Sequence, residues 1–140
     1  MTTTRAAASR PPIHMIEAEA DKLSDLALTV ETRLPQVSEL LIRETSRAKL
    51  YQPGKIPADV VTMGATAEFV DEGSGARRIV QLVYPPEADI AAGRISILTP
   101  VGAGLIGMRE GQSILWPDRD GHERVLRIVR VEQAPPAAAA

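Results

Sequence analysis

Apolar residues in the first third of the chain recur with the period of an α-helix. They are spaced by seven, three and four positions, with Leu34 one turn further on, and the stripe is Ile16, Leu23, Leu26 and Val30. Such a stripe predicts one amphipathic helix. Pro35 cannot continue that helix but fits the first turn of a second one. The inner face of the second helix would carry Val37, Leu40, Leu41 and Ala48, and the helix would end near Tyr51.

Two helices joined by so short a turn predict an antiparallel αα-hairpin over residues 13–52. Its tip would consist of Arg33, Leu34, Pro35 and Gln36. Each helix would have roughly 17 residues, so at ~1.5 Å per residue the hairpin would be about 25 Å long. The pattern leaves three roles open: an arm packed on the rest of the chain, a projecting probe, or a dimerisation surface.

Alternation replaces the helical period after residues 53–59, a linker where prolines and a glycine break any helix. Residues 60–70 alternate as a strand, which would place on one face Val61, Met63, Ala65, Ala67 and Phe69. A turn at 71–75 and a second strand at 77–84 complete a hairpin. Residues 85–94 then form an irregular crossing with room for one helical turn.

The remaining elements are one short helix and three strands. The strands are expected at 94–98, 112–116 and 123–132, the last two joined by a loop that contains Asp120 and Gly121. Thr99 can cap a helix that starts at Pro100 and stops at Gly107. The expected fold is therefore α+β, a helical hairpin followed by an antiparallel sheet with one short helix over 60–133, and low-complexity ends at 1–12 and 134–140.

Gly102, Gly104 and Gly107 spell G-x-G-x-x-G directly after an apolar run, the arrangement of a dinucleotide-binding turn. Such a site needs a βαβ unit of about 30 residues and an acidic residue about 20 positions beyond the glycines. The helix here would end at Gly107, which leaves no room for a crossover helix. We interpret the glycines as small residues that let a short helix lie close to the sheet.

Composition narrows the chemistry further. The net charge is −2 over 140 residues, and the aromatic content of 3% makes a ring-lined pocket hard to build. The chain has no cysteine, His14 and His122 lack metal-ligand spacing, and no nucleophile motif is present. No segment predicts a signal peptide or membrane span, so we expect a cytoplasmic protein without cofactor, metal or small-molecule substrate.

The last predicted strand contains three arginines, Arg124, Arg127 and Arg130. Strict alternation would place Arg127 on the face opposite to the other two. A phosphate-binding strip is one interpretation, and a solvated sheet edge is the other.

An ordered set of short motifs in residues 83–116 resembles the C-terminal domain of the bacterial Gre transcript-cleavage factors. Its pieces, in order, are Glu87-Ala88-Asp89, Arg94-Ile95-Ser96, Thr99-Pro100, Leu105-Ile106-Gly107 and Gly111. The resemblance covers residues 60–132. The short hairpin, residues 56–65 and residues 82–85 are similar to the Rnk branch of this family, whose name refers to regulation of nucleoside diphosphate kinase, over about 13–132.

The resemblance implies an FKBP-like C-terminal domain, an N-terminal coiled coil, and binding to RNA polymerase at the rim of its secondary channel. It implies docking through the Ser/Thr-Pro step, here Leu98, Thr99 and Pro100, with Asp89 added. Any nucleic-acid contact would be weak and made through the polymerase complex.

In Gre factors two acidic residues at the coiled-coil tip hold Mg²⁺ at the polymerase active site. The tip here reads ETRLPQVSE and the hairpin is short, so we expect a regulator that does not stimulate transcript cleavage. Cleavage stimulation remains the alternative within the family. A prolyl isomerase is the alternative from another class, and an adaptor for nucleoside diphosphate kinase follows only from a family name.

Overall fold

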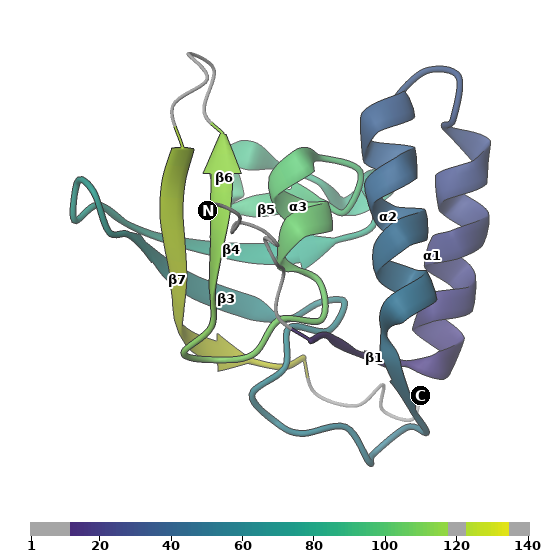
Figure 1. Ribbon diagram of the computed structural model, residues 1–140, viewed down its shortest axis with the longest axis horizontal. Coiled ribbons are helices and arrows are strands. Elements are labelled where there is room, and N and C mark those ends of the chain that lie inside the picture. Colours follow the sequence, from purple (N-terminus) through teal and green to yellow (C-terminus); the bar gives the residue numbers. More distant parts are fainter. Residues whose placement is uncertain (1–11, 118–122, 135–140) are drawn as a thin grey trace, which may run out of the picture.

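The computed structural model describes residues 12–117 and 123–134, and places a helical pair beside a five-stranded sheet (Figure 1). The α-helices are α1 (Glu17–Thr29), α2 (Pro35–Arg47) and α3 (Pro100–Leu105), and the short 3₁₀ turns are η2 (Pro85–Glu87) and η3 (Ile90–Ala92). The strands are β1 (His14–Ile16), β2 (Lys49–Tyr51), β3 (Thr66–Asp71), β4 (Arg77–Val83), β5 (Arg94–Ser96), β6 (Ser113–Pro117) and β7 (Glu123–Glu132).

Helices α1 and α2 lie side by side and are joined by a short turn at one end (Figure 1). Pro35 occupies the first turn of α2, as the sequence predicts. Each helix has 13 residues rather than the expected 17 or so, which gives a length of about 20 Å. The helices are shorter because the residues at their far ends pair with each other as the parallel strands β1 and β2, which the sequence pattern did not predict.

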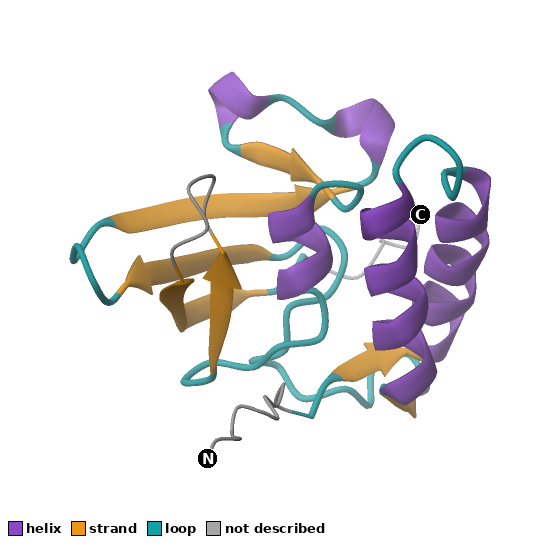
Figure 2. Cartoon of the chain, turned by 45° about the horizontal axis from the view of Figure 1, so that its top comes forward, coloured by secondary structure: helices purple, strands orange, loops and turns teal. Residues whose placement is uncertain are grey.

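The sheet has the strand order β5-β4-β3-β7-β6, and α3 lies on one of its faces (Figure 2). The pairs β4–β3 and β7–β6 are antiparallel, as predicted, and β3 and β7 also pair antiparallel. The expectation of an antiparallel sheet is wrong at one edge, because β5 pairs with β4 in parallel. The connection through η2 and η3 is the physical reason, since it returns the chain to the end of the sheet from which β4 started.

Residues 60–65 precede β3 and are not part of it, although we expected one strand over 60–70. Gly64 has φ +84°, a left-handed conformation that ends the extended path. Val60 pairs instead with Arg109 in an isolated bridge. The predicted inner face is nevertheless correct, since each of its members is buried, namely Val61, Met63, Ala65, Ala67 and Phe69.

The last strand carries a β-bulge that changes the predicted faces of its arginines. Opposite β3 the register shifts between Glu68 and Phe69, which leaves one extra residue in β7. Arg127 and Arg130 consequently share the outer face, and Arg124 lies on the other side beside Asp71, with which it pairs. The expectation that Arg127 would point away from the other two is therefore wrong.

One hydrophobic core joins the helical pair to the sheet. Leu23, Ala27 and Leu41 from the helices belong to the same buried cluster as Ile106 and Ile128. This continuity favours the packed-arm interpretation of the hairpin over a free probe. Within the described ranges, no helix has the length and apolar content needed to cross a bilayer.

Candidate functional site

The segment Leu98-Thr99-Pro100 forms a braced turn between β5 and α3. The Thr99 hydroxyl donates to the Ser96 carbonyl oxygen at 2.7 Å and accepts from the Gly102 N–H at 3.1 Å. The Ser96 hydroxyl accepts from the Leu98 N–H at 2.9 Å. The predicted cap is thus present, and Pro100 is exposed at the first helical position. Both hydrogen bonds of the Thr99 hydroxyl are made within this turn, while the side chains of Leu98 and Pro100 reach its surface.

The glycines around α3 serve close packing. A Cβ on Gly102 would lie 2.4 Å from the Ser96 carbonyl oxygen. A Cβ on Gly107 would lie 2.9 Å from the Ile13 Cβ, and Gly107 also has φ +83°. Both positions agree with the interpretation that small residues allow a short helix to approach its neighbours.

Asp89 lies in a different depression from the braced turn. Its carboxylate is 3.6 Å from the Arg94 guanidinium, and the two backbones exchange hydrogen bonds of 2.9 and 3.0 Å. Asp89 and Arg94 line an open depression of about 480 Å³ together with Pro86 and Glu87. Pro86 and Glu87 also line the groove described next, so the η2 turn separates Asp89 from Leu98.

The groove lies between α1 and the turns that follow β4 and β5, and its volume is about 790 Å³. From α1 and the turn after it come Lys22, Asp25, Leu26, Thr29, Val30 and Arg33, and the opposite wall comprises Tyr84, Pro85, Pro86, Glu87 and Leu98. It therefore brings together Arg33 of the predicted tip and Leu98 of the predicted docking segment, which are 65 positions apart in the sequence.

The other tip residues differ in exposure. Leu34 is half-buried and packs against the core, whereas Pro35 and Gln36 are exposed. The Leu34 N–H donates to the Val30 carbonyl oxygen at 2.7 Å, which closes the turn between the helices. Arg33 is exposed and has no hydrogen-bond or ion-pair partner among residues 12–117 and 123–134.

Tyr84 lines the groove, and the sequence analysis did not select this residue. The Lys22 ammonium lies 4.3 Å from the centre of its ring, a cation–π contact. Burial raises the pKa of Tyr84 to about 12, and the nearby carboxylates of Glu19 and Glu87 act in the same direction. A lone tyrosine directly after a strand gives no pattern by which sequence reasoning could have found this contact.

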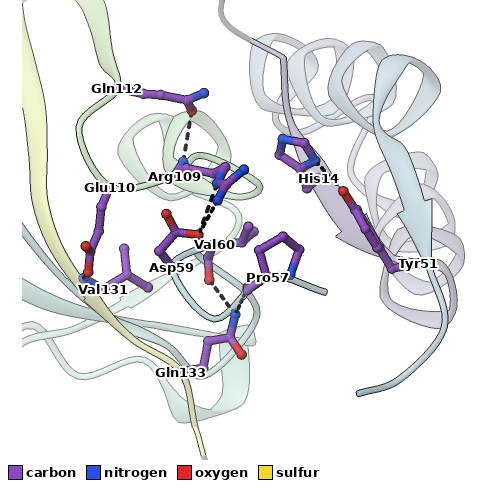
Figure 3. A network of polar contacts seen from close by, with 10 residues as sticks. All are labelled: His14, Tyr51, Pro57, Asp59, Val60, Arg109, Glu110, Gln112, Val131 and Gln133. Atoms are coloured by element: carbon purple, nitrogen blue, oxygen red, sulfur yellow. Dashed lines mark hydrogen bonds and ion pairs between the residues drawn. The ribbon is translucent and has the colours of Figure 1, made fainter. Parts of the chain in front are cut away.

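Polar contacts hold the linker that follows the hairpin, and we call their residues the base network, namely Pro57, Asp59, Val60, Arg109 and Gln133 (Figure 3). Arg109 Nε and Nη2 each lie 3.0 Å from Asp59 Oδ1. The Gln133 amide donates to the carbonyl oxygens of Pro57 and Val60, at 2.8 and 3.0 Å. These contacts hold residues 57–60, which follow the hairpin, against Arg109 on one side and Gln133 on the other.

His14 Nδ1 lies 2.9 Å from the Tyr51 hydroxyl, which joins β1 to β2 beside the base network (Figure 3). Burial lowers the pKa of His14, and the nearby cations Arg109 and Lys49 lower it further. His14 thus pairs with Tyr51 across the two strands. No cluster of three acidic, histidine or cysteine side chains suited to a metal ion occurs in the described ranges, and His122 and Asp120 lie outside them.

Comparison with known proteins identifies the class of protein to which this fold belongs. The C-terminal family of the GreA and GreB transcription elongation factors matches residues 56–133. A GreA/GreB factor from Nitrosomonas europaea has a solved structure that covers 88% of this chain and 99% of its own, with a TM-score of 0.71 and 36% identity. The fold is thus that of the GreA/GreB transcription elongation factors.

More particularly, the chain belongs to the GreA/GreB transcription elongation factor family. It is 32% identical over 130 residues to the regulator of nucleoside diphosphate kinase of Escherichia coli K12, covering 93% of this chain and 96% of that protein. It is 37% identical over 118 residues to GreA of Azorhizobium caulinodans, covering 79% and 75%. These relatives carry the names of regulators and elongation factors, and they confirm the family to which the motifs of residues 83–116 pointed.

Proposed function

We propose that the protein is a transcription regulator that binds RNA polymerase at the rim of its secondary channel and does not stimulate transcript cleavage. Docking would use Leu98, Thr99 and Pro100, with Asp89 on the far side of η2. The protein would itself be no enzyme, would need no cofactor, and would touch nucleic acid only weakly through the polymerase complex.

The braced turn is the observation that carries the docking proposal. Three hydrogen bonds fix the backbone of residues 96–102, so the turn loses little further conformational freedom when a partner covers it. Pro100 stands exposed at its apex. A rigid apolar turn with a satisfied backbone is suited to burial in a protein interface.

The hairpin supports the second half of the proposal. Cleavage stimulation in this family calls for two tip carboxylates that hold Mg²⁺, whose preferred ligands are hard oxygens. The turn between α1 and α2 contains one carboxylate, Glu31, and the cation Arg33 close to it. Helices about 20 Å long also give the tip a short reach.

Binding is tested with immobilised core RNA polymerase. The protein should be retained, and purified GreA should displace it. Pro100→Asp should weaken retention about tenfold or more, because it brings a charge to an apolar contact, whereas its matched control Pro53→Asp, at an exposed position in the linker, should not. Failure of the unaltered protein to bind core polymerase would reject the proposal.

Cleavage is tested separately on a backtracked elongation complex. GreA should shorten the transcript, while this protein at saturating concentration should leave its length unchanged. Transcripts shortened by this protein would show that the ETRLPQVSE tip is active and would favour the cleavage-factor alternative.

A further inference from the structure

Basic side chains gather at the end of the hairpin away from its tip, on three neighbouring segments of the backbone. His14 of β1 pairs in parallel register with Lys49 of β2, so their side chains stand on the same face of the pair. On the other side of β1, the His14 N–H donates to the Gly107 carbonyl oxygen at 3.0 Å, two residues before Arg109. Lys49, His14 and Arg109 therefore come from adjacent segments, and we call these three residues the basic cluster.

Burial shows that these side chains point away from the core. Met15 and Met108 are buried in the core. Alternation along extended backbone places their chain neighbours, His14 and Arg109, on the outer side. In Figure 3 the Arg109 side chain extends from its segment toward the His14 ring. Lys49 is exposed, so a ligand in solution can reach the basic cluster.

Tyr51 fixes the spacing of two members of the basic cluster. Its ring lies 5.7 Å from the His14 ring, and the Lys49 ammonium lies 5.4 Å from the centre of the Tyr51 ring. The Tyr51 hydroxyl also lies 2.9 Å from His14 Nδ1. The imidazole is thus held by one nitrogen, and Nε2 is left for another partner.

Each member of the basic cluster has a donor that is not used within residues 12–117 and 123–134. Arg109 Nε and Nη2 both contact Asp59 Oδ1, which leaves Nη1. In the same ranges, His14 Nε2 and Lys49 Nζ have no hydrogen-bond or ion-pair partner. A ligand that carries several oxygen acceptors on one centre matches such a set of donors.

The charge of the basic cluster is positive, although the chain has a net charge of −2. Asp59 offsets the charge of Arg109 and leaves that of Lys49. Glu17 lies at the other end of the β1–β2 pair, three residues or about 10 Å along the strands from His14. An anion is therefore attracted to this surface.

We propose that the basic cluster binds one phosphate group, held between the Lys49 ammonium, the His14 imidazole and the Arg109 guanidinium. A phosphate group carries three or more oxygen acceptors and a negative charge, so it can accept from three cationic donors at once. A nucleotide and the backbone of a nucleic acid both carry such a group. None of the three residues lines the groove or belongs to the braced turn, so this site is separate from the proposed docking surface.

His14 reports on binding. Burial, Arg109 and Lys49 lower its pKa, and Asp59 acts weakly in the opposite direction. In the free protein the ring is therefore neutral at about pH 7. A bound anion favours the charged ring, in which both nitrogens donate, so the pKa of His14 should rise when a ligand binds.

Titration of the ¹⁵N-labelled full chain with inorganic phosphate, followed by NMR at constant ionic strength, gives the first test. The amide signals of positions 14, 49 and 109 should shift together and saturate with a Kd of about 1 mM. The ring signals of His14, assigned with a His14→Gln variant, should report the higher pKa. Sodium acetate should cause smaller shifts, because a carboxylate has only two acceptor oxygens.

Charge reversal gives the second test. Lys49→Glu should weaken phosphate binding about tenfold or more, because it places a carboxylate beside the anion. Arg43→Glu is the matched control, since its residue is exposed on α2 outside the basic cluster and the change in net charge is the same. This variant should bind phosphate as the unaltered protein does. Both variants should unfold at nearly the same urea concentration, because both residues are exposed.

Two further ligands distinguish the sources of the phosphate group. Adenosine monophosphate that binds at least as tightly as single-stranded RNA of ten nucleotides would support the site and identify a nucleotide as its ligand. RNA that binds about tenfold more tightly, with an affinity that falls as salt rises, would support the site and identify a nucleic-acid backbone.

Three results would overturn the proposal. One is a set of amide shifts that chloride and phosphate cause alike, and another is a pKa of His14 that phosphate leaves unchanged. The third is an equal loss of phosphate binding in Lys49→Glu and Arg43→Glu. RNA polymerase takes no part in these experiments, so their outcome leaves the proposed function to its own tests.

Discussion

The two ends of the helical hairpin are built differently. At the end near β1 and β2, these two strands pair with each other, the His14 N–H donates to the Gly107 carbonyl oxygen, and Asp59 and Arg109 form an ion pair. At the tip, Arg33 is exposed and faces an apolar groove that the rest of the chain leaves open. At the base, Asp59 and Arg109 are partners of each other, whereas at the tip the Arg33 side chain is exposed to solvent.

This difference indicates a division between stability and binding. Changes near the base should lower the free energy of unfolding, since they remove contacts that the protein makes with itself. Changes at the tip should alter binding to a partner and leave folding nearly unchanged. The predictions below test the base, from the largest effect on stability to the smallest.

Gly107→Ala should have the largest effect. Its left-handed φ of +83° costs a residue with a Cβ about 1 to 2 kcal/mol, and that Cβ would meet the Ile13 Cβ at 2.9 Å and the His14 carbonyl oxygen at 3.1 Å. We expect a loss of about 3 kcal/mol in the free energy of unfolding, measured by urea denaturation.

Gly111→Ala separates the cost of the left-handed backbone from the cost of the close contacts of the added Cβ. Gly111 has a similar φ of +87°, but nothing lies within 4 Å of its added Cβ. Its loss should be about 1 kcal/mol, from backbone conformation alone. Equal losses in the two variants would contradict the idea that close approach of the hairpin base to α3 matters for stability.

Removal of the Asp59–Arg109 pair should have an intermediate effect. Both side chains are about one-third exposed, so Asp59→Ala should cost about 1 kcal/mol as Arg109 regains water. A double-mutant cycle with Arg109→Ala isolates the pair. The exposed Glu39–Arg43 pair on α2 is the control, with an expected coupling of about 0.3 kcal/mol. Equal couplings would remove the distinction between the base network and an ordinary surface pair.

The local elements of the fold were predictable, because period and turn chemistry are local signals. Pro35, the Thr99 cap, and the left-handed Gly107 each have a sequence signature, and each was confirmed. The parallel β1–β2 and β4–β5 pairs were not predictable, because three-residue strands carry no period of their own. The bulge in β7 was missed for a different reason: it lies in the pairing of β7 with β3, which alternation along one strand does not show, and with it the shared face of Arg127 and Arg130 was missed.

The candidate site was predictable only in part. The motif set predicted the docking residues Asp89, Leu98, Thr99 and Pro100. The short turn between the two helices predicted the tip residues. That Leu98 and Arg33 share one groove, while Asp89 lies beyond η2, depends on the common core that holds the hairpin against the sheet. Lys22 over the Tyr84 ring depends on the same packing. No pattern along the chain shows which residues far apart in the sequence come together in the fold.

Glu19 lies in the first turn of α1 and accepts from the Met63 N–H, and its variant should have the smallest effect. Burial raises the pKa of Glu19 above its ordinary value of 4.5, although the Met63 N–H, at 3.3 Å from Oε1, and Lys22 lower it. A raised pKa means that the folded state holds this proton more tightly, so stability falls as pH rises from the ordinary value through the raised one. Glu19→Gln keeps the acceptor for Met63 and removes the charge. The variant should therefore gain stability relative to the unaltered protein at about pH 7 but not at about pH 3.5, by less than the Asp59 effect, in parallel urea titrations. A difference that stays constant between those two pH values would show that the partly buried charge of Glu19 does not oppose folding.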